Sequence, residues 1–590
     1  MKDALVVRAE FIEPLNRVLS WMVSHEDSVG ALICPYHRIE HTGKSAGALA
    51  LACALARHDP NADRSFLARV ARTQALRIVK GLEREGDSTC FTFRPGRHDP
   101  YNCSNSVIDG GACTDALVDC VETFGAELDE ADREAFTQAA VLSAQTYLRY
   151  CILDKGVPAQ KAWAMTGAAQ AFRLSGHDVL DLAVREGARI LGELQRDDGS
   201  YPYHPLESGA GHAGAGDASC YYQSRVTAFM GFALDRAGVD SATSPWADDL
   251  RRGVDFLLGL VGPDGVKPGL LEAKPWYHGA SYEVASHPFD LYALGLGFSV
   301  LKEDRCAPAM LASFEAWAQH LLPSGEPKSH HPGPGRGKSY QCPMFWAAHA
   351  SWVARALPML EAAAQSQTPK TQEPRVRGFS DTGLVRLDSS RLSAWVRGPR
   401  PPGNLNHGSP LGAGLIRVVC LDGKELLQRD PHGRQHEGEW YSASDSGDGR
   451  SPWARWTAAW RANRTELRFS VWMLRNAFRG GELLRAAGIP WLTFQRGILG
   501  YGSRQISSAY DREASLDFIP GGVRVRGVLA HADGTRVPGA DFERCYRIEG
   551  EELRIEDSCA LGSDAHQTVP KLGTKVQRSA GSLSFSLVPR

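Results

Sequence analysis

Apolar residues are spaced differently in the two parts of the chain. Up to about residue 365 they recur three and four positions apart, which is typical of amphipathic helices that pack together. Clear examples of this spacing are 45–58, 135–153, 179–195 and 344–363. Further along, apolar and β-branched residues alternate with polar ones between Gly and Asp turns, as they do in antiparallel strands. Examples of this second pattern are 414–430, 464–474 and 521–537. The spacing therefore predicts a helical part followed by a β part.

A polar, proline-containing segment at 366–378 separates the two patterns and is interpreted as a linker. We therefore expect a helical domain over 1–365 and a β domain over 379–590. A chain of 590 residues is long enough to bury about three-quarters of its unfolded surface in such domains.

A weak repeat runs through the helical part. Turns in which an acidic residue or Pro stands beside Gly or Ser recur roughly every 60 residues, and each precedes a long polar loop and a helix of small residues. These turns are Asp27-Ser28, Gly86-Asp87, Asp154-Lys155-Gly156, Asp198-Gly199-Ser200, Pro263-Asp264-Gly265 and Pro323-Ser324-Gly325. Each interval has room for a helical hairpin, and six hairpins closing in a ring would form an (α/α)6 toroid. We predict an α+β multidomain protein with an N-terminal (α/α)6 toroid and a C-terminal antiparallel β-sandwich; an irregular helical domain is the alternative.

Composition and charge exclude several classes of protein. The 66 Lys and Arg nearly balance the 68 Asp and Glu, which argues against a protein that binds nucleic acid or a membrane surface. No apolar run reaches the ~18 residues of a transmembrane helix, and the charged N-terminus does not resemble a secretory signal. The 13 Cys are scattered without a CxxC pair, as expected of small buried side chains. We therefore expect a cytoplasmic protein without a metal or other cofactor.

The long loops of the helical part are rich in aromatic residues, His, Asn and Gly. The five segments are 34–41, 91–106, 201–225, 274–292 and 328–346. Loops this long inside a compact domain are usually functional, and aromatic faces with amide and imidazole groups suit the CH faces and hydroxyls of a sugar. The alternative is that the aromatic side chains are core residues that fill one end of the ring.

The predicted order of a toroid and a sandwich resembles the heparinase II/III-like polysaccharide lyases and their alginate-lyase relatives. In that family a helix that opens with an amide or His is followed by a Q-x-x-DG-x-Y loop and a Tyr. Here Gln160 opens such a helix, 195–201 reads QRDDGSY, and Tyr222 follows. The β part matches the family's opening strand, its Asn-His segment and its two turns. These matches are at 379–387, 404–408, 422–423 and 430–433.

The chain departs from the family pattern at two places. Gln160-Lys161 stands where the family has an Asn-His pair, and Ser409 stands at the second His of the sandwich's H-x-H-x-D pattern. Because that pattern can hold a metal, its loss agrees with the expectation of no metal.

Cleavage of a uronate-containing glycan by β-elimination assigns roles to these residues. The uronate carboxylate must be neutralised before the C5 proton can leave, and a base and an acid must move protons. Gln160, Lys161 and Arg225 are candidate neutralisers, and Tyr222 and His407 are the candidate base and acid. The other candidates are His212 in a Gly-rich loop that could close over substrate, and Trp163, Asn102, Asn105, Tyr282 and His287 as substrate-binding residues.

On this interpretation the substrate is an acidic polysaccharide or oligosaccharide. We expect Tyr222 and His407 to approach each other across the domain interface. Each residue also has a structural alternative, because Tyr222 could be a packed aromatic, His407 a turn residue and Lys161 a solvated surface charge.

Three other functions remain open. A uronate C5-epimerase would remove the same proton and return it. Asp109 with a second acid could instead hydrate an unsaturated uronide, as a glycoside hydrolase does, although Asp109 and the Asn residues before it could also simply cap the helix at 110–117. A non-catalytic glycan-binding protein would need neither an acid nor a base.

Overall fold

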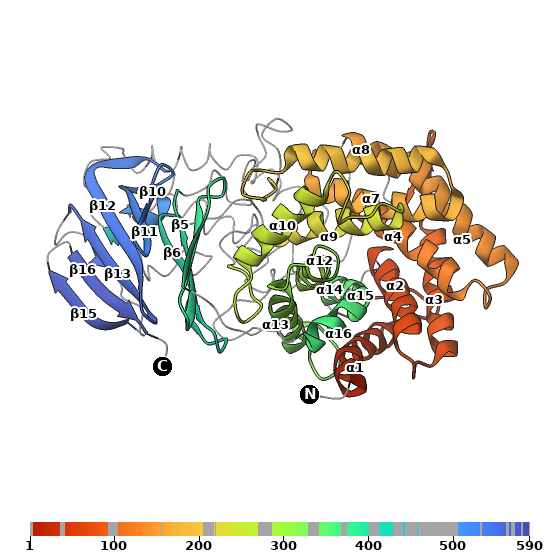
Figure 1. Ribbon diagram of the computed structural model, residues 1–590. Coiled ribbons are helices and arrows are strands. Elements are labelled where there is room, and N and C mark those ends of the chain that lie inside the picture. The colour runs from red at the N-terminus through yellow and green to blue at the C-terminus, as the bar shows by residue number, and fades with distance from the viewer. Residues whose placement is uncertain are drawn as a thin grey trace. The chain divides into compact units, whose positions relative to one another are not determined.

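The computed structural model describes most of the chain in segments. These are residues 4–35, 40, 42–91, 104–154, 156–203, 218, 220–268, 286–328, 342–366, 374–399, 412–428, 440–442, 453, 457, 506–531, 534–561, 566–567, 573–579 and 582–588. The protein is helix-rich in its first part and has antiparallel sheets in its second, which confirms the α+β class (Figure 1). The chain forms two compact units. Unit 1 comprises 1–201, 221–258 and 284–368, and unit 2 comprises 202–220, 259–283 and 369–590.

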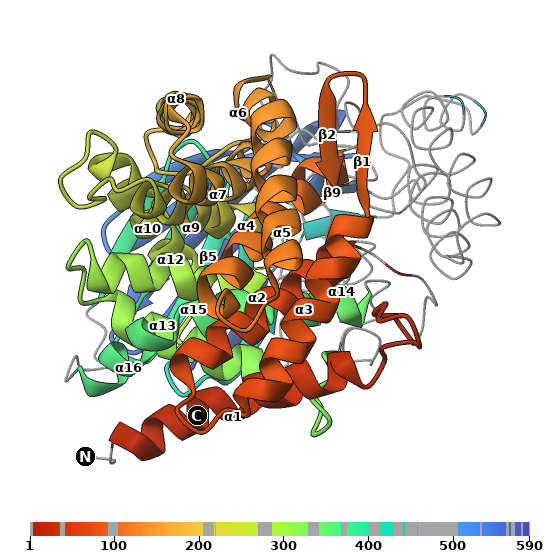
Figure 2. The same ribbon diagram turned by 90° about the vertical axis from the view of Figure 1, so that its right-hand side faces the viewer.

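Unit 1 is built from helices and one short hairpin. In chain order the elements are α1 (Ala4–Val23), α2 (Thr42–His58), α3 (Arg64–Lys80), β1 (Leu82–Glu85), β2 (Ser88–Phe91), α4 (Ser104–Phe124), α5 (Glu130–Ser143), the π-helix η1 (Ala144–Leu148), α6 (Arg149–Asp154), α7 (Pro158–Ser175), α8 (Asp178–Leu194), α9 (Cys220–Arg236), α10 (Ala247–Leu260), α12 (His287–Ser299), α13 (Cys306–Gln319), α14 (Pro343–Ala348), α15 (Ala350–Arg355) and α16 (Leu357–Gln365). The sequence pattern does not predict the hairpin β1–β2, which packs against α4, α5 and η1 (Figure 2).

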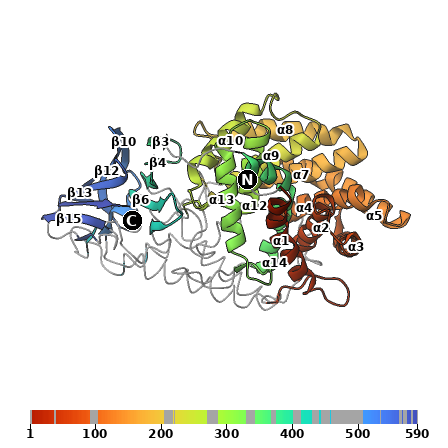
Figure 3. The ribbon, with the colours of Figure 1, turned by 60° about the horizontal axis from the view of Figure 1, so that its bottom comes forward.

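Two kinds of helix alternate along this unit. Helices α2, α7 and α12 are buried on nearly every side, and α2 and α7 are rich in Ala. Helices α3 and α8 bury one stripe of residues three and four positions apart and expose the opposite face. A helix that is apolar all round belongs in the interior, and an amphipathic one belongs outside it. Accordingly α2 packs on α3, α4 and α15, α7 on α4 and α8, and α12 on α13 and α15 (Figures 1 and 3).

Four of the six repeated turns adopt the same backbone geometry. They span 27–31, 196–200, 262–266 and 322–326, within a few residues after the ends of α1, α8, α10 and α13. In each, the N–H of the first residue donates to the carbonyl of the fifth at 2.8–3.0 Å, and the N–H of the Gly at the fourth position donates to the first carbonyl at 2.9–3.1 Å. That Gly has φ between 77° and 88°, a conformation that disfavours other residues. The repeat is therefore a structural one, in which the chain reverses after each of these helices.

Unit 2 contains two antiparallel sheets. The first has the order β3 (Arg375–Phe379), β4 (Leu384–Asp388), β5 (Leu392–Arg397), β6 (Gly414–Cys420) and β7 (Glu425–Gln428). The described strands of the second have the order β14 (His566–Gln567), β8 (Trp440–Ser442), β9 (Ile506–Ser507), β11 (Gly522–Ala530), β12 (Arg536–Glu549), β13 (Glu552–Cys559), β16 (Ser582–Leu587) and β15 (Gly573–Ser579), and β10 (Ser515–Ile519) pairs with β11.

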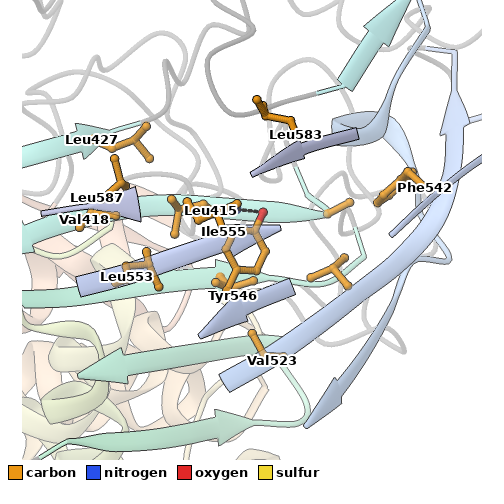
Figure 4. Packing of buried hydrophobic residues seen from close by; sticks show 14 of the residues in the cluster. Leu415, Val418, Leu427, Val523, Phe542, Tyr546, Leu553, Ile555, Leu583 and Leu587 are labelled. Atoms are coloured by element: carbon orange, nitrogen blue, oxygen red, sulfur yellow. Dashed lines mark hydrogen bonds between the residues drawn. The ribbon is translucent and has the colours of Figure 1, made fainter. Parts of the chain in front are cut away.

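The two sheets share one hydrophobic core. Leu415 and Val418 of β6 belong to the same buried cluster as Tyr546 of β12 and Ile555 of β13 (Figure 4). The backbone N–H of Leu415 donates to the Tyr546 hydroxyl at 3.1 Å, so the buried phenol is satisfied by the opposite sheet (Figure 4).

Residues 259–268 also belong to unit 2, although the residues directly before them, up to Leu258, belong to unit 1. The Trp395 Nε1–H donates to the Gly259 carbonyl at 2.9 Å, and Arg386 donates to the Val261 carbonyl at 2.9 Å. Arg417, 1% exposed, forms an ion pair with Asp264 and donates to the Val266 carbonyl at 2.7 Å. Three side chains of the five-stranded sheet therefore hold this segment through its backbone.

Among the described helices, none combines the length and the apolar character that crossing a lipid bilayer requires.

Candidate functional site

The first two turns of α7, α9 and α12 gather aromatic rings around one arginine. Arg225 of α9 is 1% exposed. Its guanidinium carbon lies 4.3 Å from the centroid of the Phe289 ring, 5.4 Å from that of Tyr222 and 5.5 Å from that of Trp163. Each of these distances is within the range of a cation–π interaction, which strengthens when the cation is removed from water. Tyr222 is partly exposed, so a buried positive charge lies beside an aromatic residue that is itself only partly buried.

Further aromatic rings pack against Trp163 and Phe289. Trp163 contacts Phe229 with ring centroids 4.8 Å apart, and Phe229 contacts Trp352 of α15 at 4.7 Å. Phe289 contacts the imidazole of His349 at 4.9 Å. The interior of unit 1 next to Arg225 is therefore apolar, and charges inside it interact more strongly than they would in water.

The QRDDGSY motif positions the first turn of α9. The Gln195 side chain donates to the Gly199 and Asp249 carbonyls at 3.1 and 3.0 Å and accepts from Arg252. The backbone of Tyr201 exchanges two hydrogen bonds of 2.7 Å with the side-chain amide of Gln223. Since Gln223 follows Tyr222 directly, this motif fixes the backbone that carries Tyr222 and Arg225.

Tyr201 itself, the last residue of the motif, is 2% exposed. Burial raises the pKa of its phenol well above the usual value, with a nearby carboxylate acting in the same direction. Tyr201 is therefore unsuited to act as a base.

A small cavity of about 30 Å³ adjoins the aromatic cluster. Asp109 of α4, Trp163 of α7 and His349 are among the residues that line it. Asp109 is 2% exposed, and burial raises the pKa of its carboxyl well above the usual value, although Lys44 acts in the opposite direction. The lining is mainly apolar, with Asp109, Asp115, His349 and Ser351 as its polar members, and the volume is enough for a water molecule. Asp109 can therefore hold a proton beside a water-sized space.

A buried His–Asp pair opens α12. His287 is the first residue of the helix, and its Nδ1 lies 3.5 Å from Asp290 Oδ2, one turn later. Both side chains are fully buried, and the Ser286 hydroxyl contacts the same carboxylate oxygen at 3.4 Å. The Asp290 carboxylate therefore faces the imidazole within the buried start of α12.

Lys161 has a structural role in the described part of the chain. It is 2% exposed, and its ammonium donates to the Ile152 and Leu153 carbonyls at 2.5 and 2.9 Å. These carbonyls lie in the last turn of α6, where no further helical N–H is available, so Lys161 closes that helix. Burial lowers the pKa of Lys161 to about 8.

Two buried aspartates of α4, Asp115 and Asp119, form ion pairs with three arginines of unit 1. Arg355 donates to Asp115 at 2.7 and 3.0 Å and to Asp119 at 2.6 Å. Arg57 and Arg236 lie 3.1 and 3.6 Å from Asp119, so α2, α4, α9 and α15 meet at this carboxylate. The arginines hold the pKa of Asp119 well below its usual range against the effect of burial, whereas burial raises that of Asp115.

The structure thus brings together Trp163, Tyr222 and Arg225 of the sequence-predicted site, and it places His287 in the helical turn that also carries Phe289. Gln160 is half-buried in the first turn of α7. Asn105 lies in the first turn of α4, but its side chain is outside the described residues. The remaining candidates, Asn102, His212, Tyr282 and His407, also lie outside the described residues, so the pairing of Tyr222 with His407 stays a prediction.

Sequence reasoning missed Phe289, Asp290 and His349. The spacing of His287 and Asp290, three residues apart at a helix start, is a signal that could have paired them. His349 carries no local signal, because only the packing of α14 and α15 brings it to the cavity. Among the described residues, no three His, Cys, Asp or Glu side chains are placed to share a metal ion.

No protein-family model matches this chain, and no curated protein matches it either. Solved structures do match. The Streptomyces coelicolor A3 chondroitin AC lyase in complex with chondroitin sulphate aligns with 98% of this chain and 70% of its own length, at 13% identity and a TM-score of 0.52. A Paenibacillus xanthan lyase covers 94% of this chain and 46% of its own at 10% identity and a TM-score of 0.48. The cellobiose 2-epimerase of Spirochaeta thermophila covers 60% of this chain and 97% of its own at 11% identity and a TM-score of 0.44. At these identities, the likeness to the chondroitin AC lyase shows a similar fold over nearly the whole chain.

Proposed function

We propose that the protein is a carbohydrate-active enzyme, a lyase that cleaves uronate-containing polysaccharides or oligosaccharides by β-elimination. The observation that carries the proposal is the buried Arg225 guanidinium among Tyr222, Trp163 and Phe289. The alternating helices of unit 1 support a closed (α/α)6 toroid, and the shared core of unit 2 supports a β-sandwich. The fold likeness to a chondroitin AC lyase supports the same class, and the QRDDGSY turn supports the heparinase II/III-like branch within it.

In this proposal the residues of the first helical turns move the protons. Tyr222 removes the C5 proton, the electron pair forms the C4–C5 double bond, and the C4–O4 bond breaks as O4 takes up a proton. The positive charge of Arg225 favours the ionised phenol, which is the form that accepts a proton. Gln160 supplies amide donors to the uronate carboxylate, and Trp163 supplies an aromatic face. The sequence-predicted His212 and His407 are the candidate donors to O4, whereas Lys161 is assigned to folding.

The test compares two tyrosines of the same unit. Tyr222→Phe should lower kcat roughly 10²-fold or more with little change in KM, because it removes a proton-transferring group. Tyr292→Phe makes the same chemical change at a buried residue that packs on Trp352, and it should retain activity. Turnover is followed by the ultraviolet absorbance of the unsaturated uronide on a panel of uronate-containing polysaccharides. Full activity of Tyr222→Phe would show that the site is misassigned.

One observation favours a second function, hydration of an unsaturated uronide. Asp109 holds its proton to higher pH than an exposed carboxyl and borders a cavity of about 30 Å³ that has room for water. A hydratase would need such an acid and a positioned water. On an unsaturated disaccharide it would remove absorbance and add the mass of one water, and Asp109→Asn would abolish the reaction.

A further inference from the structure

An open cleft of about 600 Å³ lies on unit 2, over the strands β10 to β13. Gly527 and Val528 of β11 are among the lining residues, and the register of β11 against β12 shifts beside them, at a bulge between Val528 and Ala530. Small residues, Ser515 and Ser558, line the sides. The volume falls within the ~300–1,000 Å³ that is typical of sites for small ligands, and bulges are frequent beside such sites.

One arginine of the cleft is held rigidly by two carboxylates. The Arg536 Nε and Nη2 donate to the two oxygens of Asp511 at 2.8 and 2.9 Å, and its Nη1 donates to Glu513 at 2.9 Å. Asp511 is fully buried and also accepts from the backbone N–H groups of Val528 and Glu513 at 2.8 and 3.0 Å. A guanidinium fixed in this way loses little further freedom when a ligand binds, which is the condition for a preorganised site.

The other polar side chains of the cleft include both hydrogen-bond donors and hydrogen-bond acceptors. Arg526 donates to Glu543 across the β11–β12 ladder at 3.0 Å. Asp541, next along the same face of β12, is exposed, and Ser558 of β13 offers a hydroxyl. The two arginines face three lining carboxylates, those of Glu513, Asp541 and Glu543, so the cleft has no positive excess. A sulfate or carboxylate ligand would be repelled here, whereas a sugar hydroxyl can donate to a carboxylate and accept from a guanidinium.

We infer that this cleft is a separate binding site for a neutral, polyhydroxylated ligand, a short run of uncharged sugar residues in a glycan chain. The choice of a glycan rests on the proposed function, whereas the cleft and its charge balance do not. Side chains of unit 2 would then bind the neutral sugar units of a glycan whose uronate units are cleaved at the proposed site around Tyr222.

The experiment measures binding to the full chain by titration calorimetry. The probes are neutral tetrasaccharides of glucose, mannose and xylose, with a galacturonate tetramer as the anionic comparison. Ser558→Trp fills the cleft from an exposed position of β13, and Ser579→Trp places the same side chain at an exposed position of β15 outside the cleft. Asp541→Asn removes one charged acceptor and keeps the shape of the side chain.

The wild-type chain should bind at least one neutral tetrasaccharide saturably. Ser558→Trp should abolish that binding, Asp541→Asn should raise Kd about tenfold, and Ser579→Trp should leave Kd unchanged. Unchanged binding in Ser558→Trp, or no binding of any neutral probe to the wild type, would overturn the site. Preference for the galacturonate tetramer at the same cleft would overturn the ligand class. Tyr222→Phe should bind normally, so a failure of the proposed lyase activity and a failure of this site give different results.

Discussion

Replacement of Arg355 by Met tests the buried ion network of unit 1. The Arg355 side chain is 7% exposed, and its guanidinium makes three hydrogen bonds of 2.6–3.0 Å to Asp115 and Asp119. In its absence Asp119 keeps Arg57 and Arg236 at 3.1 and 3.6 Å, whereas Asp115 keeps the Gln170 amide at 2.8 Å. The variant therefore leaves one buried carboxylate without a cation.

Breaking a buried ion pair in this way lowers the free energy of unfolding by about 3–5 kcal/mol. For a unit of about 320 residues, with an unfolding entropy of ~2.1 cal/mol/K per residue, the loss lowers the Tm of unit 1 by about 5–7 °C. Arg57→Met should cost about 1 kcal/mol or less, because Arg57 is one of three cations near Asp119 and is 32% exposed.

The same variant should change the pH dependence of stability. Burial already raises the pKa of Asp115, and loss of the Arg355 cation raises it further. The folded variant then holds a proton that the unfolded chain releases above about pH 4. Stability of Arg355→Met should be greatest below that pH and fall as the pH rises through the folded-state pKa.

Urea unfolding of both proteins between pH 4 and pH 8 measures this difference, and the double variant with Asp115→Asn should recover part of the loss. A Tm within one degree of the wild type in a thermal scan, or a variant that gains stability as the pH rises in urea unfolding, would refute the reasoning.

Three further perturbations follow from single contacts. The pKa of Lys161 in the folded chain is about 8, below its unfolded value, so the wild type should gain stability between about pH 8 and pH 10.5. Urea unfolding of Lys161→Met over the same pH range should lack that gain, and an equal gain in both proteins would show that Lys161 is not its source. Gly325→Ala should lower Tm clearly more than Gly176→Ala. Both glycines have positive φ, but only a Cβ added at Gly325 would meet a backbone carbonyl oxygen, that of Arg17 at 2.2 Å. Equal losses of Tm in calorimetry would contradict this. Tyr546→Phe should destabilise unit 2 by about 1–2 kcal/mol in urea unfolding, because it removes the buried hydroxyl that bonds across the sheets, and a neutral effect would show that the bond contributes nothing.

The sequence could predict the helices and their repeat because both depend on local patterns. Apolar spacing marks α2 and α8 within a few residues of their ends, and the Gly at the fourth position of each repeated turn is required by a positive φ. The hairpin β1–β2 was missed because it is two short strands between helices, and its pairing depends on packing against η1.

The candidate site could be predicted only in part. Tyr222 and Arg225 stand three residues apart, so one helical turn brings them together. The positions of His349 and Phe289 depend on contacts between distant helices, which a single sequence does not encode locally. Lys161 is a different case. A lysine at a helix start is expected to be exposed to solvent or to take part in catalysis, whereas the Lys161 ammonium donates to the last carbonyls of the neighbouring helix α6.

The most direct measurement of the central claim is incubation of the full chain with uronate-containing polysaccharides, with ultraviolet absorbance and mass spectrometry on the same samples. The lyase account predicts new absorbance from a C4–C5 double bond and fragments whose masses together equal that of the substrate without added water. Fragments that carry an added water, deuterium exchange at C5 without cleavage, or no change in any uronate-containing substrate would contradict it.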